Sequence, residues 1–120
     1  SNLLFGKKSY EKYYRFVGGF TDITDSSLEA TVKREGNEET NLEIDDLQYI
    51  CSKNIEDWRY SGEEDRSIMT IFFKGKKIFG NEKPQDDIVN IKWVNIETYD
   101  TDDMVEGHRS LFEELKKSLK

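Results

Sequence analysis

Apolar residues along the chain fall into short clusters whose spacing predicts both strands and helices. Near the start, two apolar and aromatic runs flank a polar turn region at Lys7-Lys8-Ser9, and the second run ends abruptly at Gly18-Gly19. Later runs are rich in β-branched and aromatic residues, which favour strands. The predicted strands are 3–5, 13–17, 47–52, 68–73 and 88–94.

Two segments carry helical signals. Ser26-Ser27-Leu28-Glu29 fits a capping box, in which the Ser26 hydroxyl accepts from the backbone N–H of Glu29, so a helix is predicted to begin at Ser26. It runs to about Thr40, and Asn41 follows as a terminator because Asn tolerates positive φ. A second, C-terminal helix is predicted where apolar positions recur every three or four residues, at Val105, His108, Leu111, Phe112, Leu115 and Leu119.

Length and composition predict one folded domain spanning 1–120. The 120 residues are enough for one core but not for two domains, and the 15 aromatic residues (7 Phe, 6 Tyr, 2 Trp) supply apolar surface that disordered chains lack. The sequence begins with Ser1 rather than Met, which leaves open whether further residues precede it.

The charge balance limits the classes of partner. Lys and Arg total 18 against 25 Asp and Glu, a net charge of −7, which works against nucleic acid or an anionic membrane as the main partner. The sequence shows neither a membrane-spanning run nor a signal peptide, so we expect a cytoplasmic protein. Cys51 and His108 are single residues of their types, which makes an internal disulfide impossible and a zinc cluster improbable.

Three carboxylates crowd one patch of the first predicted helix. Glu35, Glu38 and Glu39 stand at i, i+3 and i+4, a spacing that places like charges side by side and destabilises a helix. Carboxylate oxygens suit Mg²⁺ or Mn²⁺, and Arg34 can orient a neighbouring carboxylate. The alternative interpretation is an ordinary solvated acidic face.

The segment from Gly19 to Leu42 resembles the Nudix box, whose pattern is G-x(5)-E-x(7)-R-E-U-x-E-E-x-G-U with U apolar. Its core here is Arg34-Glu35-Gly36-Asn37-Glu38-Glu39. The resemblance implies a fold of the α/β (α+β) class, a Nudix-like α/β/α sandwich around a mixed β-sheet. It also implies Arg34, Glu35, Glu38 and Glu39 as catalytic residues, with the three glutamates as ligands of Mg²⁺ or Mn²⁺.

Three positions depart from the Nudix pattern. One extra residue precedes Arg34, so the first glutamate of the pattern falls opposite Asp25 or Ser26. Gly36 stands at an apolar position, where it either permits close packing of helix on sheet or indicates a loosened site. Asn41 replaces the final glycine, and it is the mildest replacement for a residue with positive φ.

Further short segments are similar to Nudix domains related to those fused to nicotinamide mononucleotide adenylyltransferase. These segments are 16–22, 57–60, 69–73, 86–93 and 107–112. The similarity implies hydrolysis of a nucleoside diphosphate linked to another moiety, most simply ADP-ribose to AMP and ribose 5-phosphate. A bound cation explains how an acidic protein holds such a polyanion.

Substrate contacts are expected at Gly19 and in the loop after residue 56. Trp58 and Tyr60 could stack on adenine and Arg59 could pair with phosphate or ribose, although half-buried packing of Trp58 and ion pairing of Arg59 are the ordinary alternatives. A general base is left open among Glu63, Glu64, Asp65, Asp86 and Asp87. His108 is expected to pack or to form a helix-end hydrogen bond, and Cys51 to be a small buried residue.

Two other functions are compatible with this sequence. One is a Nudix-like module that senses ADP-ribose or a related nucleotide without cleaving it, with Gly36 as the sign of lost turnover. The other is a house-cleaning pyrophosphatase acting on nucleoside triphosphates, which shares the chemistry and differs in the pocket. A homodimer is left open.

Overall fold

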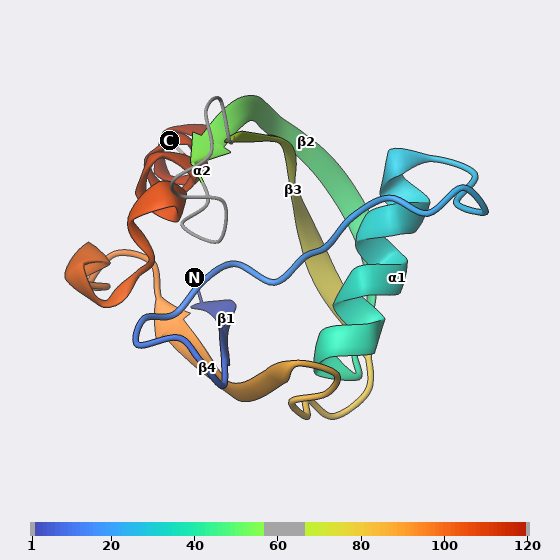
Figure 1. Cartoon of the computed structure of the whole chain (residues 1–120), viewed down its shortest axis with the longest axis horizontal. Coiled ribbons are helices and arrows are strands. Elements are labelled where there is room, and N and C mark those ends of the chain that lie inside the picture. The colour runs from blue at the N-terminus through green and yellow to red at the C-terminus, as the bar shows by residue number, and fades with distance from the viewer. Residues whose placement is uncertain (1, 57–66, 120) are drawn as a thin grey trace.

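The computed structural model describes residues 2–56 and 67–119 (Figure 1). Two helices and four strands make up most of this part of the chain. In order they are β1 (Asn2–Lys8), α1 (Leu28–Thr40), β2 (Glu43–Glu56), β3 (Ser67–Phe79), β4 (Ile88–Asn95) and α2 (Arg109–Ser118). Two short 3₁₀ turns, η2 (Thr101–Asp103) and η3 (Glu106–His108), precede α2. None of the helices described is long and apolar enough to cross a membrane.

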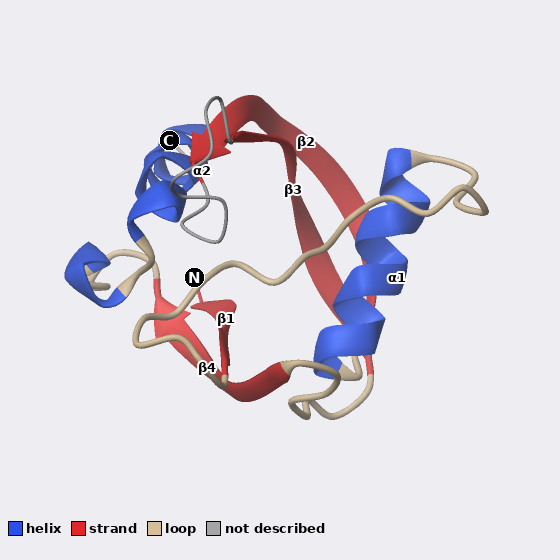
Figure 2. Ribbon diagram, viewed as in Figure 1, coloured by secondary structure: helices blue, strands red, loops and turns tan. Residues whose placement is uncertain are grey.

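The strands form two antiparallel pairs, β1 with β4 and β2 with β3. Four of the five predicted strands are confirmed, and the β2–β3 pair is longer than the apolar runs alone indicated. Figure 2 shows the two helices at opposite ends of this long pair. β2 contacts both of them: α1 packs near Ile44, and Lys53 forms a 3.4 Å ion pair with Glu114 of α2.

The strand predicted at 13–17 is wrong. This segment pairs at only one residue on each side, antiparallel at Arg15 with Gly6 of β1 and parallel at Tyr14 with Met104. It therefore threads between β1 and the 103–105 segment, bonding to each in turn: the Arg15 and Gly6 backbones exchange two hydrogen bonds, and the Tyr14 N–H donates to the Asp103 carbonyl. The segment then crosses to the start of α1 (Figure 1).

α1 begins one residue later than the capping box predicted. Ser27, not Ser26, is the N-cap, because its side chain accepts from the backbone N–H of Ala30 at 3.0 Å. The predicted end is confirmed: Asn41 has a φ of 65°, and its N–H donates to the Asn37 carbonyl.

Gly36 is the close-packing position of α1. A Cβ there would lie 2.5 Å from Cδ1 of Ile44, so the missing side chain lets the helix approach β2. From the sequence, Gly36 could indicate either close packing or a loosened site. The contact with Ile44 gives a structural reason for the glycine.

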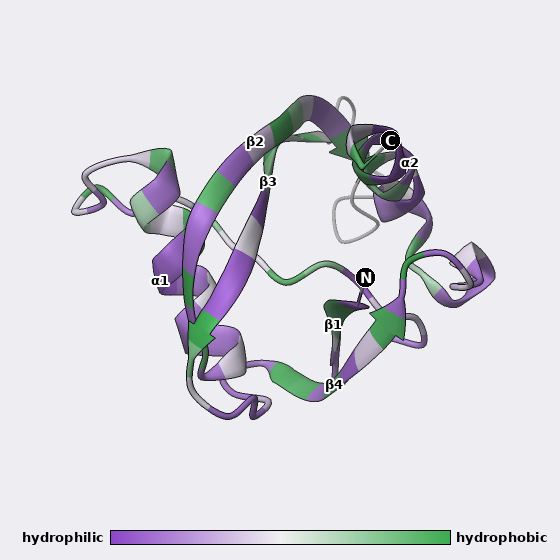
Figure 3. Ribbon diagram, turned by 180° about the vertical axis from the view of Figure 1, so that it is seen from behind, coloured by the Kyte–Doolittle hydropathy of each residue, from purple (hydrophilic) through white to green (hydrophobic). Residues whose placement is uncertain are grey.

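The hydrophobic core lies where α2 covers β1, β4 and the far part of the β2–β3 pair. Phe5 of β1 is fully buried, and its ring meets Phe16, Tyr99 and Phe112 edge-on. The C-terminal helix is confirmed in part: Leu111, Phe112 and Leu115 are buried on α2. Val105 and His108 of the predicted stripe precede the helix, and Leu119 follows it and is exposed. Apolar and polar residues are interspersed along β2 and β3 (Figure 3), as expected for strands with one buried and one exposed face. Because this core lies at the α2 end of the β2–β3 pair, α1 lies outside it.

Candidate active site

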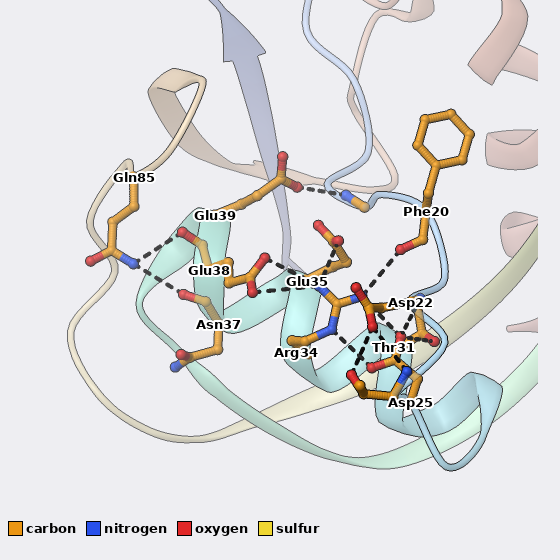
Figure 4. Close-up of polar contacts among 12 residues, drawn as sticks. Phe20, Asp22, Asp25, Thr31, Arg34, Glu35, Asn37, Glu38, Glu39 and Gln85 are labelled. Carbon is orange, nitrogen blue, oxygen red and sulfur yellow. Dashed lines mark hydrogen bonds and ion pairs between the residues drawn. The ribbon is translucent and has the colours of Figure 1, made fainter.

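A bidentate ion pair joins the middle of α1 to the segment before the helix. The Arg34 guanidinium donates from Nε and Nη2 to the two carboxylate oxygens of Asp25, each at 2.9 Å (Figure 4). This pairing holds the pKa of Asp25 well below its usual range, and hydrogen bonds from the Asp22 backbone N–H and the Thr31 hydroxyl act in the same direction. The segment before α1 thus accommodates the extra residue that precedes Arg34. Asp25, rather than Ser26, pairs with the arginine.

Arg34 also binds two of the three predicted metal ligands. Its Nη1 lies 2.9 Å from Glu35 Oε1 and 3.3 Å from Glu38 Oε2, and its Nη2 donates to the Phe20 carbonyl at 3.1 Å. The prediction that Arg34 orients a neighbouring carboxylate agrees with this geometry. Glu38 is the more exposed of the two, with a side chain 47% exposed against 15% for Glu35.

Glu39 is the buried carboxylate of the helix. It is 3% exposed, and its Oε1 accepts from the backbone N–H of Gly18 at 2.7 Å. Burial raises the pKa of Glu39 to about 7, despite the opposing effect of the Gly18 N–H. The carboxylates of Asp87 and Glu35 contribute to this rise in the pKa, and the Lys8 ammonium opposes it.

The Gly18-Gly19 backbone lies directly against these carboxylates. A Cβ at Gly19 would lie 2.3 Å from Oε2 of Glu35, so no side chain fits there while Glu35 keeps its position. At Gly18 the same Cβ would meet nothing within 4 Å. Gly19 is therefore required by the packing of the site, whereas Gly18 contributes through its N–H.

The three glutamates have different hydrogen-bond partners in this structure. Across residues 2–56 and 67–119, no three His, Cys, Asp or Glu side chains come together as a site for a metal ion. Arg34 donates to Glu35 and Glu38, whereas the Gly18 N–H donates to Glu39. Glu35 and Glu39 line one cavity with Gly18 and Gly19, and Glu38 lies outside that lining.

Of the remaining predicted site residues, some lie beyond what the structure describes. Trp58, Arg59, Tyr60, Glu63, Glu64 and Asp65 are outside the described residues. Asp86 and Asp87 are described, and both line the cavity that Glu35 and Glu39 share.

His108 and Cys51, each the single residue of its type, both pack against other residues of the fold. His108 Nδ1 accepts from the Phe16 N–H at 3.1 Å, and the two rings stack with their centroids 5.8 Å apart, which confirms the expectation of packing with a hydrogen bond. Cys51 is partly buried against the core, and burial raises the pKa of its thiol.

Sequence reasoning missed Lys8 and Gln85. Lys8 is buried at the end of β1 and forms a 3.1 Å ion pair with Asp87. The Gln85 side chain donates to the Asn37 and Glu38 carbonyls of α1 (Figure 4). A lysine in a strand and a glutamine in a turn are ordinarily solvent-exposed, so their residue types gave no signal.

Comparison with known proteins gives a family match and a set of structural likenesses. A family model described as NUDIX domain matches residues 2–115. A search of curated proteins gives no significant match.

Three solved structures illustrate the likeness of fold. The NUDIX domain of Shewanella oneidensis NrtR, complexed with ADP ribose, is 21% identical with a TM-score of 0.75, over 99% of this chain and 78% of that one. The MutT NUDIX hydrolase of Burkholderia pseudomallei is 16% identical with a TM-score of 0.77, over 95% and 88%. A UDP-X diphosphatase is 14% identical with a TM-score of 0.66, over 99% and 58%. At these identities the likeness concerns the fold, and it confirms the predicted fold class.

Proposed function

The chain belongs to the NUDIX domain family, and from this premise we propose that it is a pyrophosphohydrolase dependent on Mg²⁺ or Mn²⁺. Its substrate is a nucleoside diphosphate linked to another moiety, with ADP-ribose cleaved to AMP and ribose 5-phosphate as the most specific form of the proposal. The substrate is a small molecule, and neither nucleic acid nor membrane takes part.

One observation carries the proposal: two carboxylates of a single helix turn, Glu35 and Glu39, face one cavity across the Gly18-Gly19 backbone. The cavity has a volume of about 1890 Å³, above the roughly 300–1,000 Å³ of typical small-molecule sites. The cavity lining also includes basic residues, among them Lys8, Lys74 and Lys77. Where Glu35 and Glu39 face the cavity, a cation between them and a diphosphate is the arrangement that diphosphate hydrolysis uses.

The residues present fit a hard divalent cation. Glu35, Glu38 and Glu39 supply only carboxylate oxygens, which Mg²⁺ and Mn²⁺ prefer. Glu39 is buried with a raised pKa, so a neighbouring cation would offset the cost of its negative charge. When bound, such a cation neutralises the diphosphate and lowers the pKa of a coordinated water.

The protein's own residues position the reacting groups. Arg34 is fixed by Asp25 and in turn orients Glu35 and Glu38, while the Gly18 N–H orients Glu39. In the reaction, the oxygen of a water molecule bonds to one phosphorus as the bond from that phosphorus to the bridging oxygen breaks. The bridging oxygen leaves with the electron pair on the other phosphate.

Support for ADP-ribose comes from two sources. The sequence segments similar to ADP-ribose-cleaving Nudix domains include 16–22 and 86–93. In this structure both act on Glu39, through the Gly18 N–H and the charge of Asp87. The NrtR domain of similar fold is complexed with ADP ribose. Trp58, Arg59 and Tyr60 remain the proposed contacts for the adenine and ribose.

The discriminating experiment incubates the protein with ADP-ribose, other nucleoside diphosphate compounds and nucleoside triphosphates, with Mg²⁺ present, and identifies the products. The proposal predicts AMP and ribose 5-phosphate from ADP-ribose as the fastest reaction. Binding of ADP-ribose without cleavage would indicate the sensing module. Preferential release of pyrophosphate from triphosphates would indicate the house-cleaning enzyme.

A further inference from the structure

The segment between β3 and β4 is docked onto the last turn of α1. The Lys83 N–H donates to the Thr40 carbonyl at 2.9 Å, and the Gln85 N–H donates to the Glu39 carbonyl at 3.0 Å. The Gln85 side-chain amide adds bonds to the Asn37 and Glu38 carbonyls, at 3.0 and 3.2 Å. Gln85 therefore contacts the backbone of three consecutive residues, two of which are proposed metal ligands.

The carbonyl groups at the end of α1 explain why the segment docks there. The last carbonyls of an α-helix have no partners within the helix, and α1 has no basic residue in its last turn to satisfy them. Gln85 and the Lys83 backbone supply the missing donors. The position of the residues that follow, up to Asp87, is thereby fixed relative to the carboxylates of α1.

A second anchor, an ion pair from β1, acts on Asp87 itself. Lys8 of β1, whose side chain is 10% exposed, forms a 3.1 Å ion pair with the Asp87 carboxylate, whose side chain is 50% exposed. Lys8 pairs with Ile88 in the β1–β4 ladder, so the strand register brings the two side chains together. Both residues line the cavity that contains Glu35 and Glu39, and both charges act on the Glu39 carboxyl.

We propose that Asp87 is the proton acceptor of the hydrolysis and that Gln85 and Lys8 are positioning residues that hold it beside Glu39. The inference rests on the proposed function. As the water oxygen bonds to phosphorus and the bridging P–O bond breaks, the water proton passes to a carboxylate oxygen of Asp87. The leaving phosphate takes the electron pair of the broken bond, and Asp87 later returns its proton to solvent, to which it is half open.

Asp87 is better placed for this role than its neighbour. Asp86 adopts a φ of 56°, a turn conformation, whereas Asp87 is anchored by Lys8 and its charge acts on Glu39. Glu39 itself is occupied by the Gly18 N–H and is almost inaccessible to solvent. Among the base candidates within the described residues, Asp87 is thus both held in place and reachable by water.

The first test removes the carboxylate. Asp87→Ala is expected to lower kcat for ADP-ribose by roughly 10²- to 10⁴-fold, with a KM within a few-fold of wild type. Added formate should restore part of the lost kcat in Asp87→Ala and leave wild type unchanged, because a small carboxylate can occupy the vacated space. Asp86→Asn, which keeps a residue that tolerates positive φ, should lose much less kcat than Asp87→Ala and should gain nothing from formate.

The second test asks whether Gln85 and Lys8 act through Asp87. Gln85→Ala and Lys8→Met should each lower kcat by about 10- to 100-fold, the cost of a displacement of about 1 Å. In an Asp87→Asn background neither should cause further loss. Lys83→Ala is the matched control, since its docking contact is made by the backbone and survives the substitution.

The outcomes distinguish a failure of the role proposed for Asp87 from a failure of the proposed hydrolase function. A wild-type chain that cleaves ADP-ribose, with an Asp87→Ala variant equally active or not rescued by formate, overturns the inference and leaves the function standing. Additive losses in the double variants overturn the positioning roles. A wild-type chain that cleaves no nucleoside diphosphate overturns the proposed function, and the inference with it.

Discussion

Arg34 and Asp25 form a bidentate pair in which both guanidinium-to-carboxylate hydrogen bonds measure 2.9 Å. The same guanidinium contacts Glu35 and Glu38, so its orientation determines where two of the proposed metal ligands lie. Asp25 is thus linked to the site through Arg34, without lining the cavity itself.

Asp25→Asn should therefore lower kcat while leaving the fold intact. An Asn amide presents N–H groups to a guanidinium that has only donors, so one of the two bonds is lost and Arg34 is free to shift. We expect a loss of roughly 10- to 100-fold, as for other partners that orient metal ligands. Steady-state kinetics on ADP-ribose measures it.

Asp22→Asn is the control for this prediction. Asp22 accepts hydrogen bonds from Thr24 in the same loop and makes none with Arg34. An equal loss of kcat in both variants would mean that the loop as a whole matters, rather than the contact of Asp25 with Arg34.

Gly19→Ala should damage the site, and Gly18→Ala should not. A Cβ at Gly19 would overlap the Glu35 carboxylate, which must then move, whereas the Cβ at Gly18 enters open space and the N–H to Glu39 remains. A displacement of about 1 Å can cost roughly 10²-fold in rate. Parallel kinetics and thermal melts of the two variants test this, and similar activity in both would contradict the packing of Glu35 against Gly19.

The raised pKa of Glu39 predicts a dependence of stability on pH in the metal-free protein. Its pKa is about 7 in the folded chain against an ordinary 4.5, so the folded state holds a proton that the unfolded state releases. The contribution to the free energy of unfolding is fully present below pH 4.5 and is lost as the pH rises through 7. The shift corresponds to about 3 kcal/mol.

Glu39→Gln isolates this contribution, because Gln keeps an acceptor for Gly18 and does not ionise. Unfolding free energies measured without metal from pH 4.5 to 8 should show wild type losing stability relative to Glu39→Gln as the pH rises. Added Mg²⁺ should reduce the difference at pH 8. A pH-independent difference between the two proteins would show that the Glu39 carboxyl titrates normally.

The helix and the motif on it were predictable from sequence because local chemistry determines them. Asn41 ends α1 as expected for a residue that tolerates positive φ, and the acidic cluster, Arg34 and the Gly18-Gly19 segment lie in one region. The start was misplaced by one residue, since Ser26 and Ser27 are equally good caps and only the turn that carries Asp25 to Arg34 decides between them.

Contacts between distant segments could not be read from sequence. The 13–17 run has the composition of a strand, yet Tyr14 and Arg15 bond to different neighbours, a choice made by tertiary packing. Lys8 meets Asp87 only because of the β1–β4 register. Helical spacing places the three glutamates near one another, but it does not reveal that Arg34 donates to Glu35 and Glu38 while the Gly18 N–H donates to Glu39.

Glu35→Gln and Glu39→Gln test the assigned metal ligands separately from the fold. Neutralising either carboxylate removes a charged oxygen ligand, so kcat should fall by roughly 10²- to 10⁴-fold. Metal-free thermal stability at pH 7.5 should not fall, because one charge is removed from a crowded acidic patch. Activity within a few-fold of wild type in both variants would contradict the assignment.

The central claim is tested most directly by following wild-type protein and ADP-ribose with chromatography of the products. The account predicts AMP and ribose 5-phosphate in equal amounts when Mg²⁺ or Mn²⁺ is present, no turnover after chelation, and recovery when the metal is returned. ADP-ribose that binds but stays intact with either metal would contradict it.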